Sequence, residues 1–256
     1  MLKESEKWIL PENLKKQEEE DMKHVDEGTF DGRGDFGSYY GLLAGQNINW
    51  VKSHAVMDDR SALNYIKQVR GILLDCDIIP KNLDILDIGC GPGTITNAFH
   101  SLLENCSVTG IDISRHSIEY AQKTYPNCVF IQRGVDCQTN LPQKYNIIHS
   151  REFYPFTRTS DIETHLAYIK MFSKHLHKNG IIIIYFFAPS LETFADTYSK
   201  IDGKLSEMQL TPIIRSPRAN VKISHFVSLP ISIKLTQIIY RCLNKKPAYF
   251  YITRKT

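Results

Sequence analysis

The stretch that decides the fold runs Asp84-Ile85-Leu86-Asp87-Ile88-Gly89-Cys90-Gly91-Pro92-Gly93-Thr94, a short apolar run that ends in a glycine-rich turn. Glycines at such a turn let the backbone approach a ligand, and the following helix points its N–H groups at that ligand. A dinucleotide-binding loop reads G-x-G-x-x-G, but here Thr94 stands where the third of those glycines belongs. Pro92 also removes one amide that a pyrophosphate could use. No lysine follows, so the turn is not a phosphate-binding P-loop.

Outward from this turn, apolar runs alternate regularly with amphipathic stretches. We expect strands at residues 83–88, 107–111, 128–132, 145–149 and 180–187, and helices at 94–103, 114–123 and 161–177. This alternation predicts an α/β fold with a parallel sheet that helices cover on both faces. Farther on we expect a helix at 191–201, a strand at 221–227, a helix at 231–243 and a final strand at 248–253, while 206–218 cannot be assigned.

The first 75 residues differ in texture from the rest and are expected to form an N-terminal cap. Residues 2–24 are rich in Glu and Lys, residues 28–50 are rich in glycine and aromatic residues, and a helix is expected from Asp58. A glycine- and aromatic-rich segment suits a lid that closes over a ligand, and equally a long connecting loop. We therefore divide the chain into this cap, residues 1–75, and one structural unit, residues 76–256.

Composition places the chain among ordinary globular proteins of 256 residues, with 42% hydrophobic and 23% charged residues. A net charge of +3 is too small to argue for nucleic acid or a membrane surface as a partner. The six cysteines form no CxxC pair and no cluster at zinc spacing, so we expect free thiols, a cytoplasmic location and no metal. The longest apolar run, residues 181–188, is too short to span a bilayer, and no apolar export signal follows the first residues.

The D-x-G-C-G-P-G pattern of the turn resembles the class I S-adenosylmethionine (SAM)-dependent methyltransferases. The resemblance covers residues 83–187 and includes later stretches, of which the clearest are Gly110-Ile111-Asp112-Ile113 at the end of the second strand and Gly134-Val135-Asp136-Cys137 after the third. It implies a Rossmann-like, seven-stranded, mostly parallel, doubly wound sheet with an antiparallel C-terminal strand. It also implies SAM as the methyl donor and S-adenosylhomocysteine (SAH) as the product.

The resemblance assigns each of these stretches a part of the cofactor. Asp112 would accept hydrogen bonds from both ribose hydroxyls, Ile113 would pack on the adenine, and Asp136 would accept from the adenine amino group with the Cys137 amide alongside. Ser150 would present backbone to the methionine end, and Asp87 would bond to the ammonium or instead stabilise the turn. The expected cofactor-binding residues are Asp87, Gly89, Cys90, Gly91, Gly93, Asp112, Ile113, Asp136, Cys137 and Ser150.

The acceptor is expected at the loop that follows the fourth strand, since ligands of doubly wound sheets lie at the carboxyl ends of the strands. This loop carries Arg151, Glu152, Tyr154 and Arg158 as the candidate catalytic residues. The two arginines favour an anionic acceptor, although Arg151 could equally pair with Glu152 at a helix start. A hydroxyl acceptor would need a base, for which Glu152, His149 or Tyr154 is nearest by sequence, although a histidine in a buried strand is more often a hydrogen-bonded core residue.

The sequence therefore predicts a methyltransferase that O-methylates a small anionic metabolite, phosphorylated or nucleotide-linked, in the decoration of a bacterial surface glycan. The acceptor loop lacks the [NDS]-P-P-[YF] motif, the paired glutamates and the Pro-Cys nucleophile of other methyltransferase classes. A tRNA or rRNA methyltransferase and a SAM-binding module without catalysis remain alternatives, while the glycine spacing argues against an NAD-dependent oxidoreductase. We expect no membrane partner, and the oligomeric state is open.

Overall fold

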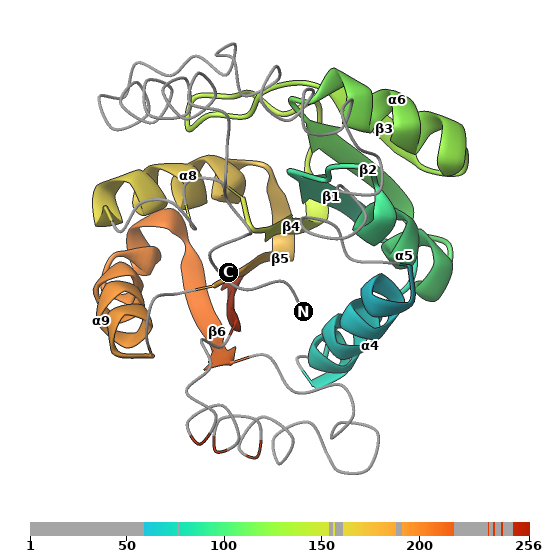
Figure 1. Ribbon diagram of the computed structural model, residues 1–256. Coiled ribbons are helices and arrows are strands. Elements are labelled where there is room, and N and C mark those ends of the chain that lie inside the picture. The colour runs from blue at the N-terminus through green and yellow to red at the C-terminus, as the bar shows by residue number, and fades with distance from the viewer. Residues whose placement is uncertain are drawn as a thin grey trace, which may run out of the picture.

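The computed structural model describes residues 59–75, 77–153, 156, 161–187, 191–217, 235, 238, 242 and 248–256 (Figure 1). Its helices are α4 (Asp59–Asp75), α5 (Thr94–Leu102), α6 (Arg115–Thr124), α8 (Ile162–Lys174) and α9 (Leu191–Asp202), with a 3-10 turn at Leu205–Met208. Its strands are β1 (Asp84–Ile88), β2 (Ser107–Asp112), β3 (Val129–Gln132), β4 (Tyr145–Arg151), β5 (Leu176–Phe187), β6 (Leu210–Pro217) and β7 (Ala248–Lys255).

The strands of the described residues form one seven-stranded sheet in the order β3-β2-β1-β4-β5-β7-β6. The first five in that order pair in parallel, and β7 pairs antiparallel with both β5 and β6. This confirms the predicted α/β fold, with its mostly parallel doubly wound sheet and its antiparallel C-terminal strand. Because the strand order reverses between β1 and β4, the carboxyl ends of β1, β2 and β4 meet where such folds bind their ligands.

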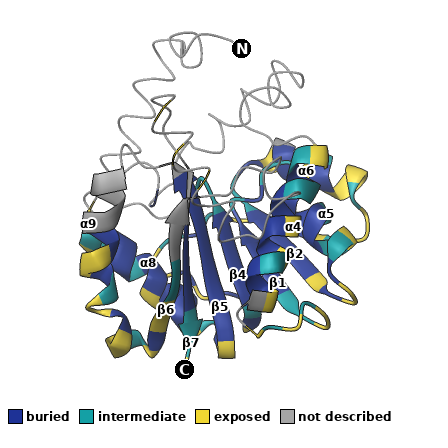
Figure 2. Ribbon diagram, turned by 90° about the horizontal axis from the view of Figure 1, so that it is seen from below, coloured by how far each residue is buried: buried dark blue, intermediate teal, exposed yellow. Residues whose placement is uncertain are grey.

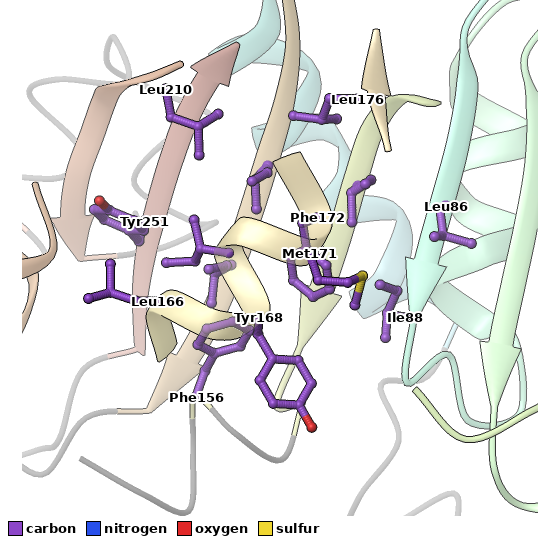
Figure 3. Packing of buried hydrophobic residues seen from close by; sticks show 14 of the residues in the cluster. Leu86, Ile88, Phe156, Leu166, Tyr168, Met171, Phe172, Leu176, Leu210 and Tyr251 are labelled. Carbon is purple, nitrogen blue, oxygen red and sulfur yellow. The ribbon is translucent and has the colours of Figure 1, made fainter. Parts of the chain in front are cut away.

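Helices cover both faces of the sheet, and Figure 2 shows the buried strands between α8 and α9 on one side and α4, α5 and α6 on the other. The side chains of successive residues of β4 point to opposite faces of the sheet. Ile147 packs in the cluster with α4 and α5, and Ile148 packs in the cluster with α8. Figure 3 shows Met171 of α8 beside Ile88 of β1, and Phe172 and Leu86 belong to the same cluster. Full burial of one such side chain is worth about 1.5–3 kcal/mol, so these two clusters fix the sheet between its helices.

The structure corrects the sequence prediction at one helix. We expected a helix at 161–177, but α8 ends at Lys174 and β5 already begins at Leu176, earlier than the predicted strand at 180–187. Leu176 continues the helical sequence pattern, but its backbone pairs with Tyr145 of β4. It therefore belongs to strand β5 and not to helix α8.

The C-terminal part also contains a strand that we did not assign, β6. It carries Pro212 and Pro217 and lies at the edge of the sheet, where proline is tolerated because one side of the strand is unpaired. The expected strand at 221–227 lies outside the described residues, as does most of the expected helix at 231–243, of which residues 235, 238 and 242 are helical.

The N-terminal cap lies mostly outside the described residues, which begin at Asp59. The helix expected from Asp58 is confirmed as α4, and its buried residues Tyr65, Ile66 and Val69 pack in the cluster that covers the sheet. The division of the chain at residue 75 stays a prediction, although α4 packs on the same sheet as the elements that follow it.

Candidate functional site

The glycine turn between β1 and α5 needs glycine for two physical reasons. Gly89, Gly91 and Gly93 have φ values of 70°, 52° and 82°, a left-handed conformation that costs other residues about 1–2 kcal/mol each. A Cβ atom at Gly93 would also lie 2.7 Å from the ring of Phe130, and one at Gly89 would lie 3.3 Å from Phe153. At Gly91, by contrast, nothing lies within 4 Å of the Cβ position, so this glycine faces open space.

The N–H groups of this turn are all taken by the protein itself. The amides of Gly89 and Cys90 donate to Ile111 O at 2.8 and 3.1 Å, and that of Gly93 donates to Cys90 O at 3.1 Å. The Gly91 amide donates to Asp112 Oδ2 at 2.8 Å, and Pro92 has no N–H. The turn therefore offers no nest of amides to a pyrophosphate, which agrees with the exclusion of a dinucleotide from its spacing.

Asp112 lies at the carboxyl end of β2, directly beside the turn, and is half-buried. Its Oδ2 accepts from Gly91 N and its Oδ1 from Ser114 N, both at 2.8 Å. Burial raises the pKa of the Asp112 carboxyl above its ordinary value, and the two amide hydrogen bonds oppose that rise. Because a carboxylate oxygen can accept two hydrogen bonds, both oxygens of this fixed carboxylate can still accept from a ligand.

Gly110, whose role we did not predict from the sequence, makes the close contact between the glycine turn and β2 possible. A Cβ atom at Gly110 would lie 2.8 Å from Cys90 Sγ and 2.9 Å from the ring of Phe130, so only glycine lets the turn lie against β2. A lone glycine inside a strand is the signal that could have indicated this close approach.

The third predicted stretch also lies at this edge, since β3 pairs with β2 and Arg133 N donates to Asp112 O at 2.9 Å. Asp136 closes a small turn there, because its Oδ1 accepts from Gln138 N at 2.8 Å and from the Thr139 hydroxyl at 2.9 Å. Among the described residues its Oδ2 has no hydrogen-bond partner. Ile113 is partly buried and Cys137 is exposed. The structure thus places Asp112, Ile113, Asp136 and Cys137 at the ends of neighbouring strands.

Asp87 is 2% exposed, and both of its carboxylate oxygens have partners within the protein. Oδ2 accepts from the Thr96 hydroxyl and Oδ1 bonds His149 Nδ1, both at 2.7 Å. The expected contact of Asp87 with a ligand ammonium stays a prediction, whereas the prediction of His149 as a hydrogen-bonded core histidine is confirmed. We had not singled out the roles of Thr96 and of Tyr65, whose hydroxyl lies 2.7 Å from His149 Nε2.

Cys90 is 8% exposed and has the character of a packing residue. Burial raises the pKa of its thiol well above the ordinary value, and the carboxylates of Asp112 and Asp87 raise it further. The thiol therefore stays protonated at neutral pH and is a poor nucleophile, and the assignment of Cys90 as a cofactor-binding residue stays a prediction.

The acceptor side is described only in part, because Tyr154 and Arg158 lie outside the described residues. Ser150 is 1% exposed, and its hydroxyl has no hydrogen-bond partner among the described residues. Arg151 places its guanidinium over the ring of Tyr185 at 5.6 Å, and its buried Nε has no partner in the same part of the chain. Glu152 has a left-handed φ of 52°, and its amide donates to Tyr185 O at 2.8 Å. Within the described residues, Arg151 and Glu152 do not form the ion pair with each other that was the alternative role for Arg151.

The described residues contain no group of three or more His, Cys, Asp or Glu side chains placed to hold a metal ion. Within the same residues, every helix is too short or too polar to cross a membrane.

Comparison with known proteins shows the family to which the chain belongs. Residues 79–243 match the family model described as "Methyltransferase domain". Protein 235L of Invertebrate iridescent virus 6, a methyltransferase by its name, is 40% identical over 105 residues, which are 41% of this chain and 36% of that protein. Trans-aconitate 2-methyltransferase of Yersinia pestis is 35% identical over 66 residues, 26% of this chain and 25% of that enzyme. The chain thus matches only about a quarter to a third of these relatives' length.

Among solved structures, magnesium protoporphyrin IX methyltransferase from Synechocystis PCC 6803 with bound SAH superposes with a TM-score of 0.56 at 14% identity. The superposition covers 88% of this chain and 100% of that chain. A SAM-dependent methyltransferase from Clostridium acetobutylicum superposes with a TM-score of 0.53 at 13% identity, covering 85% of this chain and 98% of the other. At this level of identity the likeness concerns the fold.

The geometry of the turn predicts unequal costs at two of its glycines. Gly93→Ala adds a strained φ and a clash with the Phe130 ring, so we expect a loss of about 2–5 kcal/mol of unfolding free energy. Gly91→Ala adds only the strain and should cost about 1–2 kcal/mol. Urea denaturation of both variants measures the difference, and equal losses would show that the packing against Phe130 does not constrain the turn.

Proposed function

The chain belongs to the methyltransferase domain family, and from this premise we propose that it is a SAM-dependent methyltransferase that O-methylates a small anionic acceptor. The observation that carries the proposal is the Asp112 carboxylate, which two amides hold beside the glycine turn at the carboxyl end of β2. A carboxylate fixed at this point is placed to accept from the two hydroxyls of a ribose.

The residues around Asp112 fit the parts of SAM in order along the sheet edge. The ribose hydroxyls donate to Asp112, and the adenine lies between Ile113 and the turn at Asp136, whose Oδ2 can accept from the amino group. The Cys137 amide lies beside the same ring. The open space at Gly91 supports the approach of the methionine end to the backbone there.

The N-terminus of α5 fits the methionine carboxylate. Its N-cap is Gly93, which offers no side-chain hydrogen bond to the first amides of the helix. Those amides and the positive end of the helix dipole favour a carboxylate. Ser150 is the register partner of Ile88 near the carboxyl end of β4, and its buried hydroxyl, which has no partner among the described residues, can bond the same end of the cofactor.

Methyl transfer asks mainly for positioning, since SAM supplies a methyl group that is already activated on a sulfonium. The protein must hold the acceptor oxygen in line with that group, and good alignment is worth up to about 7–11 kcal/mol of the barrier. An acceptor oxygen that is already ionised needs no base. A hydroxyl acceptor would give its proton to the ionised side chain of Glu152, a carboxylate, or of Tyr154, a tyrosinate.

Arg151 supports an anionic acceptor. Its guanidinium lies over Tyr185 at 5.6 Å, its Nε is buried without a partner, and no carboxylate among the described residues neutralises it. A half-buried cation without a counter-ion is unfavourable unless a ligand supplies the negative charge. Arg158 would contribute from the same loop. Trans-aconitate, which the Yersinia pestis relative methylates according to its name, is itself an anion. The phosphorylated or nucleotide-linked class and the surface-glycan role stay predictions.

The cofactor assignment predicts a large effect at Asp112. Asp112→Ala removes two charge-assisted hydrogen bonds to the ribose, each worth about 1.5–3 kcal/mol, so the Kd for SAH should rise by about 100-fold or more. Asp84→Ala removes the same charge at the amino end of β1, the end away from the glycine turn. It should leave the Kd for SAH within about twofold of the wild-type value. Isothermal titration calorimetry of both variants decides the matter, and unchanged SAH affinity of Asp112→Ala would refute the ribose assignment.

The acceptor assignment predicts that Arg151→Ala raises the acceptor KM by about 10- to 100-fold, because a charge-assisted contact is lost, while the KM for SAM stays the same. Acceptors would first be found by mass spectrometry against phosphorylated sugars, nucleotide-linked sugars and trans-aconitate. Arg70→Ala, an exposed arginine on α4, is the control. An acceptor KM that does not respond to Arg151→Ala would contradict an anionic pocket at this residue.

A further inference from the structure

Four polar side chains from four different elements form a continuous hydrogen-bonded line inside the core. The Thr96 hydroxyl of α5 donates to Asp87 of β1, Asp87 bonds His149 of β4, and His149 bonds the Tyr65 hydroxyl of α4. Each of the three contacts is 2.7 Å long. The four residues are 0–2% exposed. We refer to Tyr65, His149, Asp87 and Thr96 as the buried relay.

The surroundings of the buried relay are apolar. The ring of Phe99 lies edge-on to His149 at 5.2 Å, and Tyr65 stacks on Phe250 at 5.6 Å. Burying polar groups costs free energy unless each finds a partner, and well-packed apolar side chains in the same space often serve stability as well or better. The value of the buried relay therefore lies in the geometry that its short, directional bonds impose.

The buried relay runs between the two parts of the candidate site, the glycine turn and the acceptor side at Arg151. Asp87 and Thr96 flank the glycine turn on either side, so their hydrogen bond ties the end of β1 to the first turn of α5. His149 pairs with Asp87 across the sheet and directly precedes Ser150. The ring centroids of Tyr65 and Tyr185 lie 5.1 Å apart, and the Arg151 guanidinium lies over the same Tyr185 ring at 5.6 Å.

We propose that Tyr65, His149, Asp87 and Thr96 are positioning residues that hold the glycine turn in register with the carboxyl end of β4. The proposal rests on the proposed function, because the turn and Ser150 are the surfaces that bind opposite sides of the methionine end of SAM. Asp87 then acts through Thr96 and His149 and needs no direct contact with the cofactor. A turn that is not held in place must be ordered when the ligand binds, which lowers affinity.

The test compares hydroxyl removals inside and outside the buried relay by calorimetric titration with SAH. Thr96→Val and Tyr65→Phe should each raise the Kd for SAH by about tenfold, and Thr96→Ser, which keeps the hydroxyl, should restore the wild-type value. Thr253→Val is the control for the first change, since Thr253 is 1% exposed and its hydroxyl has no partner in the described part of the chain. Tyr145→Phe is the control for the second, since Tyr145 is 1% exposed at the opposite end of β4.

Melting temperatures without ligand separate positioning from mere stability. A purely structural relay would lower the melting temperature of Thr96→Val and Tyr65→Phe while the folded variants bound SAH within twofold of the wild type, and that result would overturn the proposal. Tenfold weaker SAH binding in the relay variants, with unchanged binding in both controls, supports it. If the wild-type chain did not bind SAH at all, the proposed function and this inference would both fail.

Discussion

The Asp112 carboxylate holds the site together, because its two oxygens join the glycine turn to the end of β2 through the amides of Gly91 and Ser114. The turn reaches this position only because Gly110 leaves room for Cys90 and Phe130. The same geometry consumes the amides of the turn and leaves the carboxylate to meet a ligand. A site built in this way suits a ribose with two hydroxyl donors better than a pyrophosphate.

A second set of interactions fixes β1, which leads into the turn, against its neighbour β4. Asp87 and His149 are register partners on β1 and β4, and both point to the face covered by α4 and α5. The turn is therefore held on one side by Asp112 of β2, which bonds Gly91, and at its two ends by Asp87 and Thr96 of the buried relay. Methyl transfer depends on alignment more than on acid–base chemistry, so a rigid frame of this kind matches the reaction that we propose.

Much of this architecture follows from local sequence pattern. The strand–turn–helix at residues 84–94 and the alternation up to β5 were predicted because short apolar runs, glycine turns and helical periodicity are local signals. The Asp112 and Asp136 stretches were predicted because they resemble those of the class I SAM-dependent methyltransferases, and the structure places both at the ends of neighbouring strands. Strand β6 was not predicted because Pro212 and Pro217 argue against a strand, and only its place at the sheet edge accommodates them.

The buried relay could not be predicted for a different reason. His149 is 62 residues from Asp87 and 84 from Tyr65 in the sequence, and nothing local to any of them indicates their contact. The end of α8 was missed in the same way, because pairing of Leu176 with Tyr145 overrides a helical pattern. Long-range pairing thus decides both features.

A crystal structure of the protein with SAH is the measurement that tests the central claim most directly. The account predicts both ribose hydroxyls at about 2.5–3.0 Å from the Asp112 carboxylate oxygens, with the hydrogen bonds from Gly91 and Ser114 still in place. A structure in which the ribose of SAH makes no contact with Asp112, or in which SAH binds away from the glycine turn, would contradict it.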